Sequence, residues 1–219
     1  MKPIKLGVLI SGGGSNLQAI IDGIESGRLS AEIAVVISNE PDAYGLARAR
    51  NHGLNQVVVS HRDFADRAGF EARLTEVLKV HGVELVVLAG FMRVLTKVFL
   101  RAFPERVINI HPALLPSFPG SHVWQQEVEY GVKFAGCTVH FVDEGVDSGP
   151  IIIQAVVPVL DDDDAASLAA RILRQEHRIY PQAIQLLAEE RLRIEGRRVK
   201  VLPLDHALEE AALINPPLA

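Results

Sequence analysis

Short apolar runs that read as β-strands alternate with amphipathic stretches over the first ninety residues. The strand-like runs are residues 5–10, 32–37, 56–60 and 84–89, and the later helix-like stretches are residues 42–51 and 66–81. The first helix-like stretch places Leu17, Ile20 and Ile24 on one face and stops near Gly27. This strand–helix alternation predicts a parallel sheet with helices on both faces.

The second half of the chain changes character. Strand-like runs at 106–110, 134–142 and 150–157 flank a proline-rich loop, and a long helical pattern over 165–190 precedes a hairpin of 191–194 with 199–202. We expect an α/β fold with a mostly parallel central sheet, helices on both faces and a mixed or antiparallel C-terminal extension. The chain reads as one domain over residues 1–219 with a loose tail.

Composition excludes several classes of protein. The longest uncharged apolar run, residues 85–92, is far shorter than the ~20 residues that span a bilayer, so we expect no membrane segment. Cys137 is the one cysteine in 219 residues, which rules out a disulfide framework and a cysteine-built zinc site. The net charge of −5 gives no general footprint for nucleic acid, although a local basic patch stays open. We expect a cytoplasmic protein.

A glycine-rich loop, Ser11-Gly12-Gly13-Gly14-Ser15-Asn16, follows the first strand-like run. Glycines let the backbone approach a ligand, and the N–H groups at a helix start favour a phosphate. No lysine follows the glycines, so the loop is not a Walker A motif. It is also a poor dinucleotide fingerprint, because Leu17 takes the third glycine position. A tight turn in which Ser15 or Asn16 caps the helix is the alternative.

Polar residues end the strand-like run 106–110. In Asn109-Ile110-His111-Pro112 two polar side chains lie at i and i+2, so they point the same way where sheet ligands commonly bind. An amide N–H and a protonated imidazole that converge on one point suit an oxyanion. The equal alternative to an oxyanion site is a structural histidine whose hydrogen bonds are made beside a proline turn.

A nearby acid would orient His111 and favour its charged form. Asp143, Glu144 and Asp147 lie in a turn-rich link between two predicted strands, and sequence physics does not choose among them. His140 alternates with apolar neighbours and is interpreted as structural. No group of His, Cys, Asp and Glu has metal-ligand spacing, so no metal is expected.

Several separate segments, taken together, resemble the folate-dependent phosphoribosylglycinamide formyltransferases of the formyltransferase family. They are residues 9–20, 88–93, 109–116, 139–142 and 147–150, and they occur in the family's order. The resemblance covers about residues 4–190 and implies a Rossmann-like fold. Departures from the family pattern occur at Gly13, Ser117, residues 121–126 and Ser148.

The resemblance implies roles for the matching residues. Asn109, His111 and Asp147 match the catalytic trio. Contacts to the ribonucleotide phosphate and glycinamide are matched by Gly14, Ser15, Asn16 and Glu176. Positions around the formyl-folate are matched by Arg67, Met92, Arg93, Val94, Leu95, Asn109, Asp143, Glu144, Gly145, Val146 and Asp147. Residues 1–105 would hold the ribonucleotide and residues 106–190 the catalytic and folate sites, with a hairpin and tail at 191–219.

The resemblance also implies a reaction. The formyl group of 10-formyltetrahydrofolate, a co-substrate, would pass to the glycine amine of 5′-phosphoribosylglycinamide in purine biosynthesis. No metal is implied, the partners are these small molecules, and the chain would be a monomer or homodimer.

Competing functions stay open at this point. Formyltetrahydrofolate hydrolase shares the trio, but we expect an extra N-terminal domain in that enzyme. Methionyl-tRNA formyltransferase would carry a C-terminal extension. A nucleotide-binding oxidoreductase and a non-catalytic nucleotide-binding module belong to different classes and complete the set of candidates.

Overall fold

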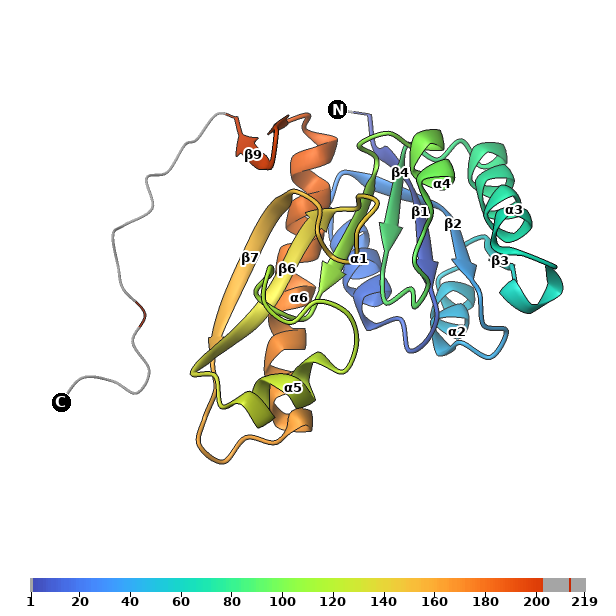
Figure 1. The fold of residues 1–219 in the computed structure, drawn as a ribbon. Helices are drawn as coiled ribbons and strands as arrows, with labels where there is room; N and C mark the ends of the chain where they lie inside the picture. The colour runs from blue at the N-terminus through green and yellow to red at the C-terminus, as the bar shows by residue number, and fades with distance from the viewer. Residues whose placement is uncertain (1, 203–212, 214–219) are drawn as a thin grey trace.

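One mixed sheet organises the chain in the computed structural model, which describes residues 2–202 and residue 213 (Figure 1). Within these residues the nine strands run in the order β3-β2-β1-β4-β5-β6-β7-β9-β8. Their bounds are β1 Ile4–Ile10, β2 Ala31–Ser38, β3 Gln56–Val58, β4 Leu85–Leu88, β5 Val107–His111, β6 Phe134–Phe141, β7 Ile151–Pro158, β8 Leu192–Glu195 and β9 Arg198–Val201.

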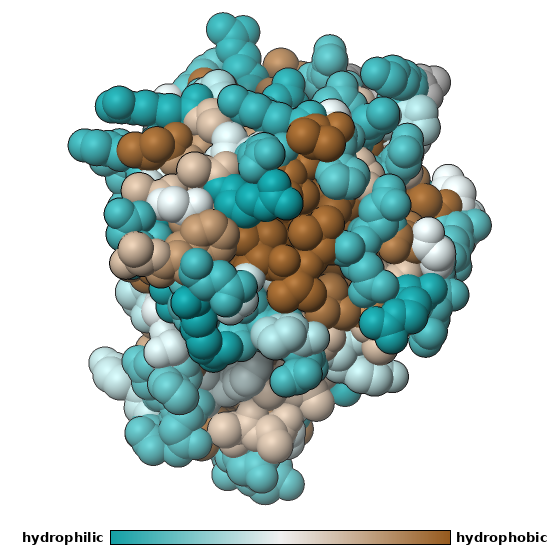
Figure 2. Space-filling model, turned by 90° about the vertical axis from the view of Figure 1, so that its right-hand side faces the viewer, coloured by the Kyte–Doolittle hydropathy of each residue, from teal (hydrophilic) through white to brown (hydrophobic). Residues whose placement is uncertain are grey.

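Helices cover both faces of this sheet. Their bounds are α1 Ser15–Glu25, α2 Tyr44–Asn51, the 3₁₀ turn η1 His61–Asp63, α3 Arg67–Val80, α4 Lys97–Ala102, α5 Val123–Tyr130 and α6 Ala165–Ala188. Apolar residues of α1, α2 and α6 pack in one core, and those of α3 and α4 pack in a second core. Seen from the side of α3 and β3, a band of apolar surface lies between hydrophilic side chains (Figure 2).

The strand directions confirm the expected fold class. β1 pairs in parallel with β2 and β4, and β4 pairs in parallel with β5. The sheet then reverses, because β6 is antiparallel to both β5 and β7. β8 and β9 form the expected antiparallel hairpin, which joins β7 through a single parallel pair. The fold is therefore Rossmann-like in its first half and carries an antiparallel extension.

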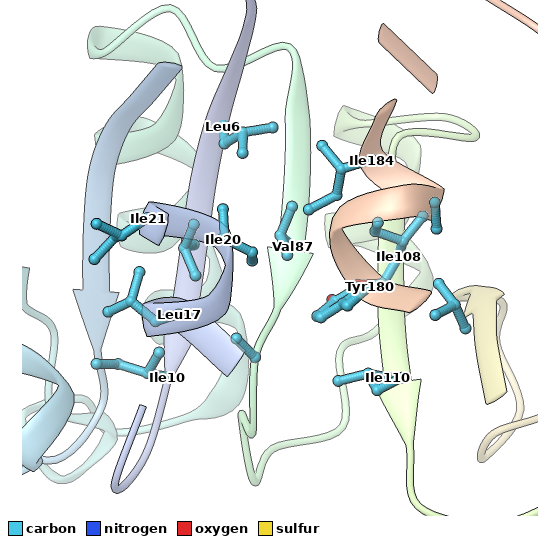
Figure 3. Close-up of a cluster of buried hydrophobic side chains, with 14 of the residues drawn as sticks. Leu6, Ile10, Leu17, Ile20, Ile21, Val87, Ile108, Ile110, Tyr180 and Ile184 are labelled. Atoms are coloured by element: carbon cyan, nitrogen blue, oxygen red, sulfur yellow. The ribbon is translucent and has the colours of Figure 1, made fainter. Parts of the chain in front are cut away.

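The alternation of β5 decides which side chains are available for chemistry. Ile108 and Ile110 point into the core beneath α6 (Figure 3). Because successive strand residues face opposite sides, Asn109 and His111 lie on the other face. That face is covered by α3 and α4 only over the first half of the sheet. The strand therefore presents two polar side chains where no helix covers the sheet.

The structure has two short helices, α4 and α5, that the sequence patterns do not predict. α4 follows the fourth strand, and α5 follows the proline-rich loop. Both are short, and no side chain caps either N-terminus; α5 starts from His122 in the left-handed region at φ 59°. Helices of 6 and 8 residues are too short for their apolar period to stand out in the sequence. The tail expected at the C-terminus lies outside the described residues, apart from residue 213.

Tyr180 of α6 ties the long helix to the centre of the sheet. Its side chain is fully buried, and its hydroxyl is 2.9 Å from the carbonyl oxygen of Leu88 and 3.2 Å from that of Ile108. These carbonyls belong to β4 and β5, the neighbouring strands that lead into the polar site. A buried hydroxyl without a partner would be costly, so these contacts favour one position of α6 on the sheet.

Tyr180→Phe tests this anchor. The substitution keeps the ring and leaves the two buried carbonyls without the hydroxyl, so we expect a loss of about 1–3 kcal/mol in the free energy of unfolding. Urea denaturation measures it. Tyr130→Phe, at a side chain that is 80% exposed, is the control and should change little. Equal stabilities of the two variants would contradict the anchor.

Glu127 is the buried acid of α5. It is 1% exposed, and its Oε2 has no hydrogen-bond partner among the described residues. Burial raises the pKa of this carboxyl to about 7, from an ordinary value of 4.5. The folded chain therefore keeps the Glu127 proton over a pH range in which the unfolded chain has lost it.

Glu127→Gln should remove this pH dependence. The contribution of Glu127 to the free energy of unfolding is most favourable below pH 4.5. It is lost as the pH rises to about 7, because the folded state must then bury a charged carboxylate. We expect the variant to be more stable than the wild type at pH 8, by up to about 2–3 kcal/mol, and to lose this advantage near pH 5. Urea denaturation at the two pH values measures the difference. A constant difference between wild type and variant would show that Glu127 does not titrate in this range.

Candidate active site

A cavity of about 820 Å³ opens on the uncovered face of the sheet. The ends of β4, β5 and β6 form its floor, and two loops together with the start of α5 form its walls. Its wall residues come from 90–95, 120–125 and 142–147, except Glu144. The cavity is therefore built where the parallel part of the sheet meets the antiparallel part.

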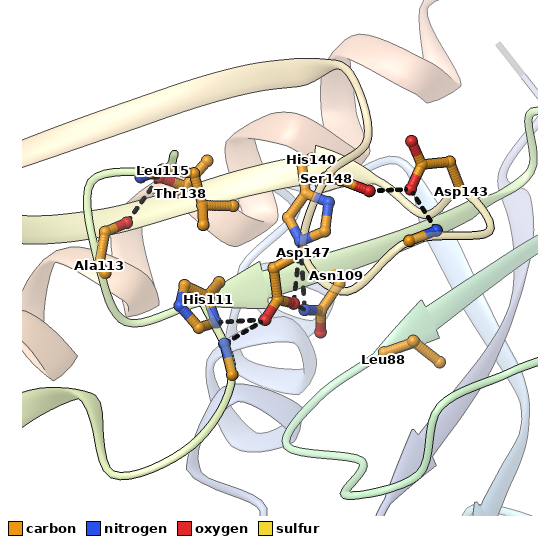
Figure 4. A network of polar contacts seen from close by, with 12 residues as sticks. Leu88, Asn109, His111, Ala113, Leu115, Thr138, His140, Asp143, Asp147 and Ser148 are labelled. Atoms are coloured by element: carbon orange, nitrogen blue, oxygen red, sulfur yellow. Dashed lines mark hydrogen bonds and ion pairs between the residues drawn. The ribbon is translucent and has the colours of Figure 1, made fainter. Parts of the chain in front are cut away.

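His111 lies at the floor of this cavity, and Figure 4 shows its ring beside the carboxylate of Asp147. Nδ1 is 3.3 Å from Oδ2 of Asp147, and Nε2 is 2.8 Å from the carbonyl oxygen of Phe118. Both partners are acceptors, so the two contacts are satisfied together only when each nitrogen carries a hydrogen. The ring is 4% exposed, so both contacts are made away from bulk water.

Asp147 receives contacts from several elements. The N–H of Gly120 donates to Oδ2 at 2.9 Å, and Nδ2 of Asn109 donates to Oδ1 at 3.4 Å. Burial alone would raise the pKa of this carboxyl, but the contact with His140, the Gly120 hydrogen bond and the charge of His111 outweigh it, so the pKa is lowered. Asp147 therefore stays ionised beside His111.

The structure separates the three acids that sequence physics left open. Asp143 turns back on its own loop, where its Oδ1 accepts hydrogen bonds from the N–H of Gly145 and from Oγ of Ser148. Glu144 does not reach the cavity wall. Asp147 adopts a left-handed backbone at φ 49°, and its carboxylate meets Asn109 and His111. It is thus the acid that the fold brings to the polar pair.

His140 has a larger part in the site than the structural one that its strand pattern indicates. β5 and β6 pair Asn109 with His140, so both side chains lie on the cavity face. Nε2 of His140 is 3.3 Å from Nδ2 of Asn109 and 3.7 Å from Oδ1 of Asp147. Its Nδ1 donates to the carbonyl oxygen of Phe141 at 2.8 Å, which fixes the ring. The sequence signal for His140 is a polar residue in an otherwise buried strand. The sequence does not show that Asn109 lies beside it, because that contact arises from the pairing of β5 with β6.

The glycine loop forms a second region beside the cavity. Gly14 caps α1 at φ 69°, and no side chain makes a capping hydrogen bond there, so the alternative of a Ser15 or Asn16 cap is wrong. The Ser11 hydroxyl accepts a hydrogen bond from the N–H of Met92 at 2.8 Å. Since residues 90–95 line the cavity, this bond joins the two regions.

Asn16 and Glu176 meet near the glycine loop although they are far apart in sequence. Nδ2 of Asn16 is 2.6 Å from Oε2 of Glu176, and both side chains are buried. Burial raises the pKa of Glu176, while the hydrogen bond from Asn16 partly opposes the shift. Oδ1 of Asn16 is buried and has no hydrogen-bond partner among the described residues.

Of the remaining residues that the resemblance places around the formyl-folate, most line the cavity and one does not. Met92, Arg93, Val94 and Leu95 form one wall of the cavity, and Gly145 and Val146 belong with Asp143 to another wall. Arg67, the first residue of α3, is not part of the walls. Its predicted contact with the folate stays a prediction.

The described residues offer neither a cluster of metal ligands nor a membrane span. No group of three or more His, Cys, Asp and Glu side chains among them could hold a metal ion. In the same part of the chain, no helix combines the length and apolarity needed to cross a membrane.

Comparison with known proteins shows the family. The formyl transferase family model matches residues 4–184. The chain belongs to the formyl transferase family. Among solved structures, glycinamide ribonucleotide transformylase 1 from Symbiobacterium toebii has a TM-score of 0.90 and 56% identity, over 92% of this chain and 95% of that one. The family fold therefore extends over nearly all of both chains.

Curated relatives agree with this membership. Phosphoribosylglycinamide formyltransferase of Haemophilus influenzae is 44% identical over 191 residues, or 87% of this chain and 90% of that protein. The trifunctional purine biosynthetic protein adenosine-3 of Drosophila melanogaster is 52% identical over 185 residues. The match covers 84% of this chain but only 14% of the Drosophila protein.

Gly149 tests the geometry of the Asp147 loop. A Cβ at this position would lie 1.8 Å from the carbonyl oxygen of Phe141, so Gly149→Ala must displace the loop that carries Asp147. We expect a loss of at least about 2 kcal/mol in the free energy of unfolding, measured by urea denaturation. Gly13→Ala, where a Cβ meets nothing within 4 Å, is the control and should change little. A Gly149→Ala protein as stable as this control would show that the loop is looser than the structure indicates.

Proposed function

We propose that this chain transfers the formyl group of 10-formyltetrahydrofolate to the glycine amine of 5′-phosphoribosylglycinamide, a step of purine biosynthesis. The observation that carries the proposal is the meeting of Asn109, His111 and Asp147 at the floor of a cavity that a hydrogen bond joins to a glycine loop. Relatives named for this reaction support it.

In this proposal the ribonucleotide lies along the glycine loop and the folate lies in the cavity. The free N–H groups at the start of α1, near Gly14, Ser15 and Asn16, bind the phosphate. Glu176 and the free Oδ1 of Asn16 accept hydrogen bonds from the glycinamide ribonucleotide. The two substrates then approach each other at Ser11 and Met92, where the regions are joined.

The folate is held by both walls of the cavity. Residues 92–95 form one wall, and Asp143 with residues 145–147 forms the other. Arg67 and Glu144 lie outside these walls, so we assign them to the outer part of the folate, where the Arg67 guanidinium suits its carboxylates. The apolar part of the cavity suits the flat rings.

The proposed chemistry is direct attack. The neutral amine attacks the formyl carbon, and negative charge develops on the formyl oxygen. Nδ2 of Asn109 and the charged ring of His111 stabilise this oxygen, which takes the place of the Phe118 carbonyl as acceptor from Nε2. The bond from carbon to the folate nitrogen then breaks. A proton leaves the amine and one reaches that nitrogen, so tetrahydrofolate and the formylated ribonucleotide are released.

Asp147 supports this reaction in two ways. Its carboxylate keeps His111 charged and oriented, because Nδ1 donates to Oδ2 throughout. It also aids the transfer of the proton from the attacking amine to the leaving nitrogen. His140 fixes Asn109 from the adjacent strand, so it acts as a positioning residue.

A steady-state assay tests the function. Formation of tetrahydrofolate from 10-formyltetrahydrofolate is followed with and without the ribonucleotide. We expect product only when the ribonucleotide is present. Equal product without it would identify a hydrolase, and no product in either case would leave a nucleotide-binding module.

The same assay tests the trio. Asp147→Asn and Asn109→Ala should each lower kcat by at least about 100-fold, since each removes a group that acts on the developing charge. Asp161→Asn is the matched control, because that carboxylate is 96% exposed, and its kcat should be unchanged. Near-normal kcat in Asp147→Asn would remove Asp147 from the mechanism.

A further inference from the structure

The glycine loop is held from one side by α2. The N–H of Gly45 donates to the carbonyl oxygen of Gly12 at 3.0 Å, and Nε of Arg48 donates to that of Gly13 at 2.9 Å. The two backbones touch, since a Cβ on Gly14 would lie 2.7 Å from Cα of Gly45. Both loop carbonyls are therefore fixed toward α2.

This arrangement determines the direction of the loop N–H groups. In a planar trans peptide the C=O of one residue and the N–H of the next point in opposite directions. The N–H groups of Gly13 and Gly14 thus point away from α2, because the carbonyls of Gly12 and Gly13 point toward it. Arg48 contributes directly to this orientation through its Nε.

The Arg48 guanidinium also brings charge to the start of α1. Its Nη1 donates to Oε1 of Gln18 at 3.2 Å, and its Cζ lies 5.0 Å from the centre of the Tyr44 ring. It lines a groove of about 270 Å³ together with Ser15, Gln18, Ala19, Asp22, Arg28 and His177. Two arginines against one aspartate make this groove positive.

The groove holds an unpartnered polar atom, and the loop beside it lacks positive charge. Nε2 of His177 is buried and has no hydrogen-bond partner among the described residues. The loop itself, residues 11–16, contains no cationic side chain. A phosphate bound at the loop N–H groups therefore takes its counter-charge from outside the loop, and Arg48 contacts the loop at the Gly13 carbonyl.

We propose that Arg48 is the residue that positions the glycine loop for the phosphate of the ribonucleotide, and that its guanidinium supplies positive charge next to that loop. This inference rests on the proposed function for the identity of the ribonucleotide. Arg48 acts on one substrate only, since it lies outside the walls of the large cavity.

Kinetics of variants test the proposal. Arg48→Ala should raise KM for the ribonucleotide about tenfold or more, the effect of losing a hydrogen bond to a charged group. Its kcat should stay within about threefold and its KM for formyl-folate within about twofold, because the cavity is unchanged. Arg48→Lys keeps the charge but loses the Nε contact, so its KM for the ribonucleotide should lie between those of the wild type and Arg48→Ala. Arg50→Ala is the control, an exposed arginine on the same helix.

A binding measurement separates this proposal from the function. Isothermal titration of each variant with ribose 5-phosphate needs no turnover, and we expect Arg48→Ala alone to lose about tenfold or more in affinity. Unchanged affinity and unchanged KM for the ribonucleotide in Arg48→Ala would overturn the proposal. So would an equal change in both KM values with a lowered melting temperature, which would show a purely structural role. If the wild type transfers no formyl group, the proposed function fails, and the titration still decides the role of Arg48.

Discussion

The carboxylate of Asp147 is the interaction on which the polar site depends. It accepts from the N–H of Gly120, from Asn109 and from His111, so it joins β5 to the loop that carries Gly120 and to its own loop. A buried negative charge is stable only when its partners are close and well placed. The carboxylate therefore holds the loop geometry together, and that geometry in turn lowers its pKa.

The position of this carboxylate follows from the reversal of the sheet after β5. Parallel strands end together at one edge, while the antiparallel β6 and β7 bring their connecting loop back toward β5. Gly149 fits against the Phe141 carbonyl at the end of that loop, and Asp147 takes a left-handed backbone. Tyr180 fixes α6 on the opposite face and leaves the site face open.

Much of the fold could be predicted because its signals are local. The buried runs of β1 and β4 and the glycines between elements indicate a parallel sheet, and period 2 places Asn109 and His111 on one face. The helices α4 and α5 escape prediction because 6 and 8 residues are too few to show a clear apolar period. The strand pattern indicates only a structural role for His140, because its neighbour, Asn109, lies on another strand.

The sequence by itself determined the class of fold, the glycine loop, the polar pair on β5 and the resemblance that led to the family. These depend on neighbouring residues, whose spacing sets secondary structure and which face a side chain takes. The resemblance had matched Asp147 to the catalytic trio, but only the tertiary structure shows the physical reason, which is that this carboxylate meets His111. The tertiary structure alone also decided that His140 borders Asn109 and that Arg48 holds the glycine loop. These contacts join residues far apart in the chain, and strand pairing and helix packing bring them together.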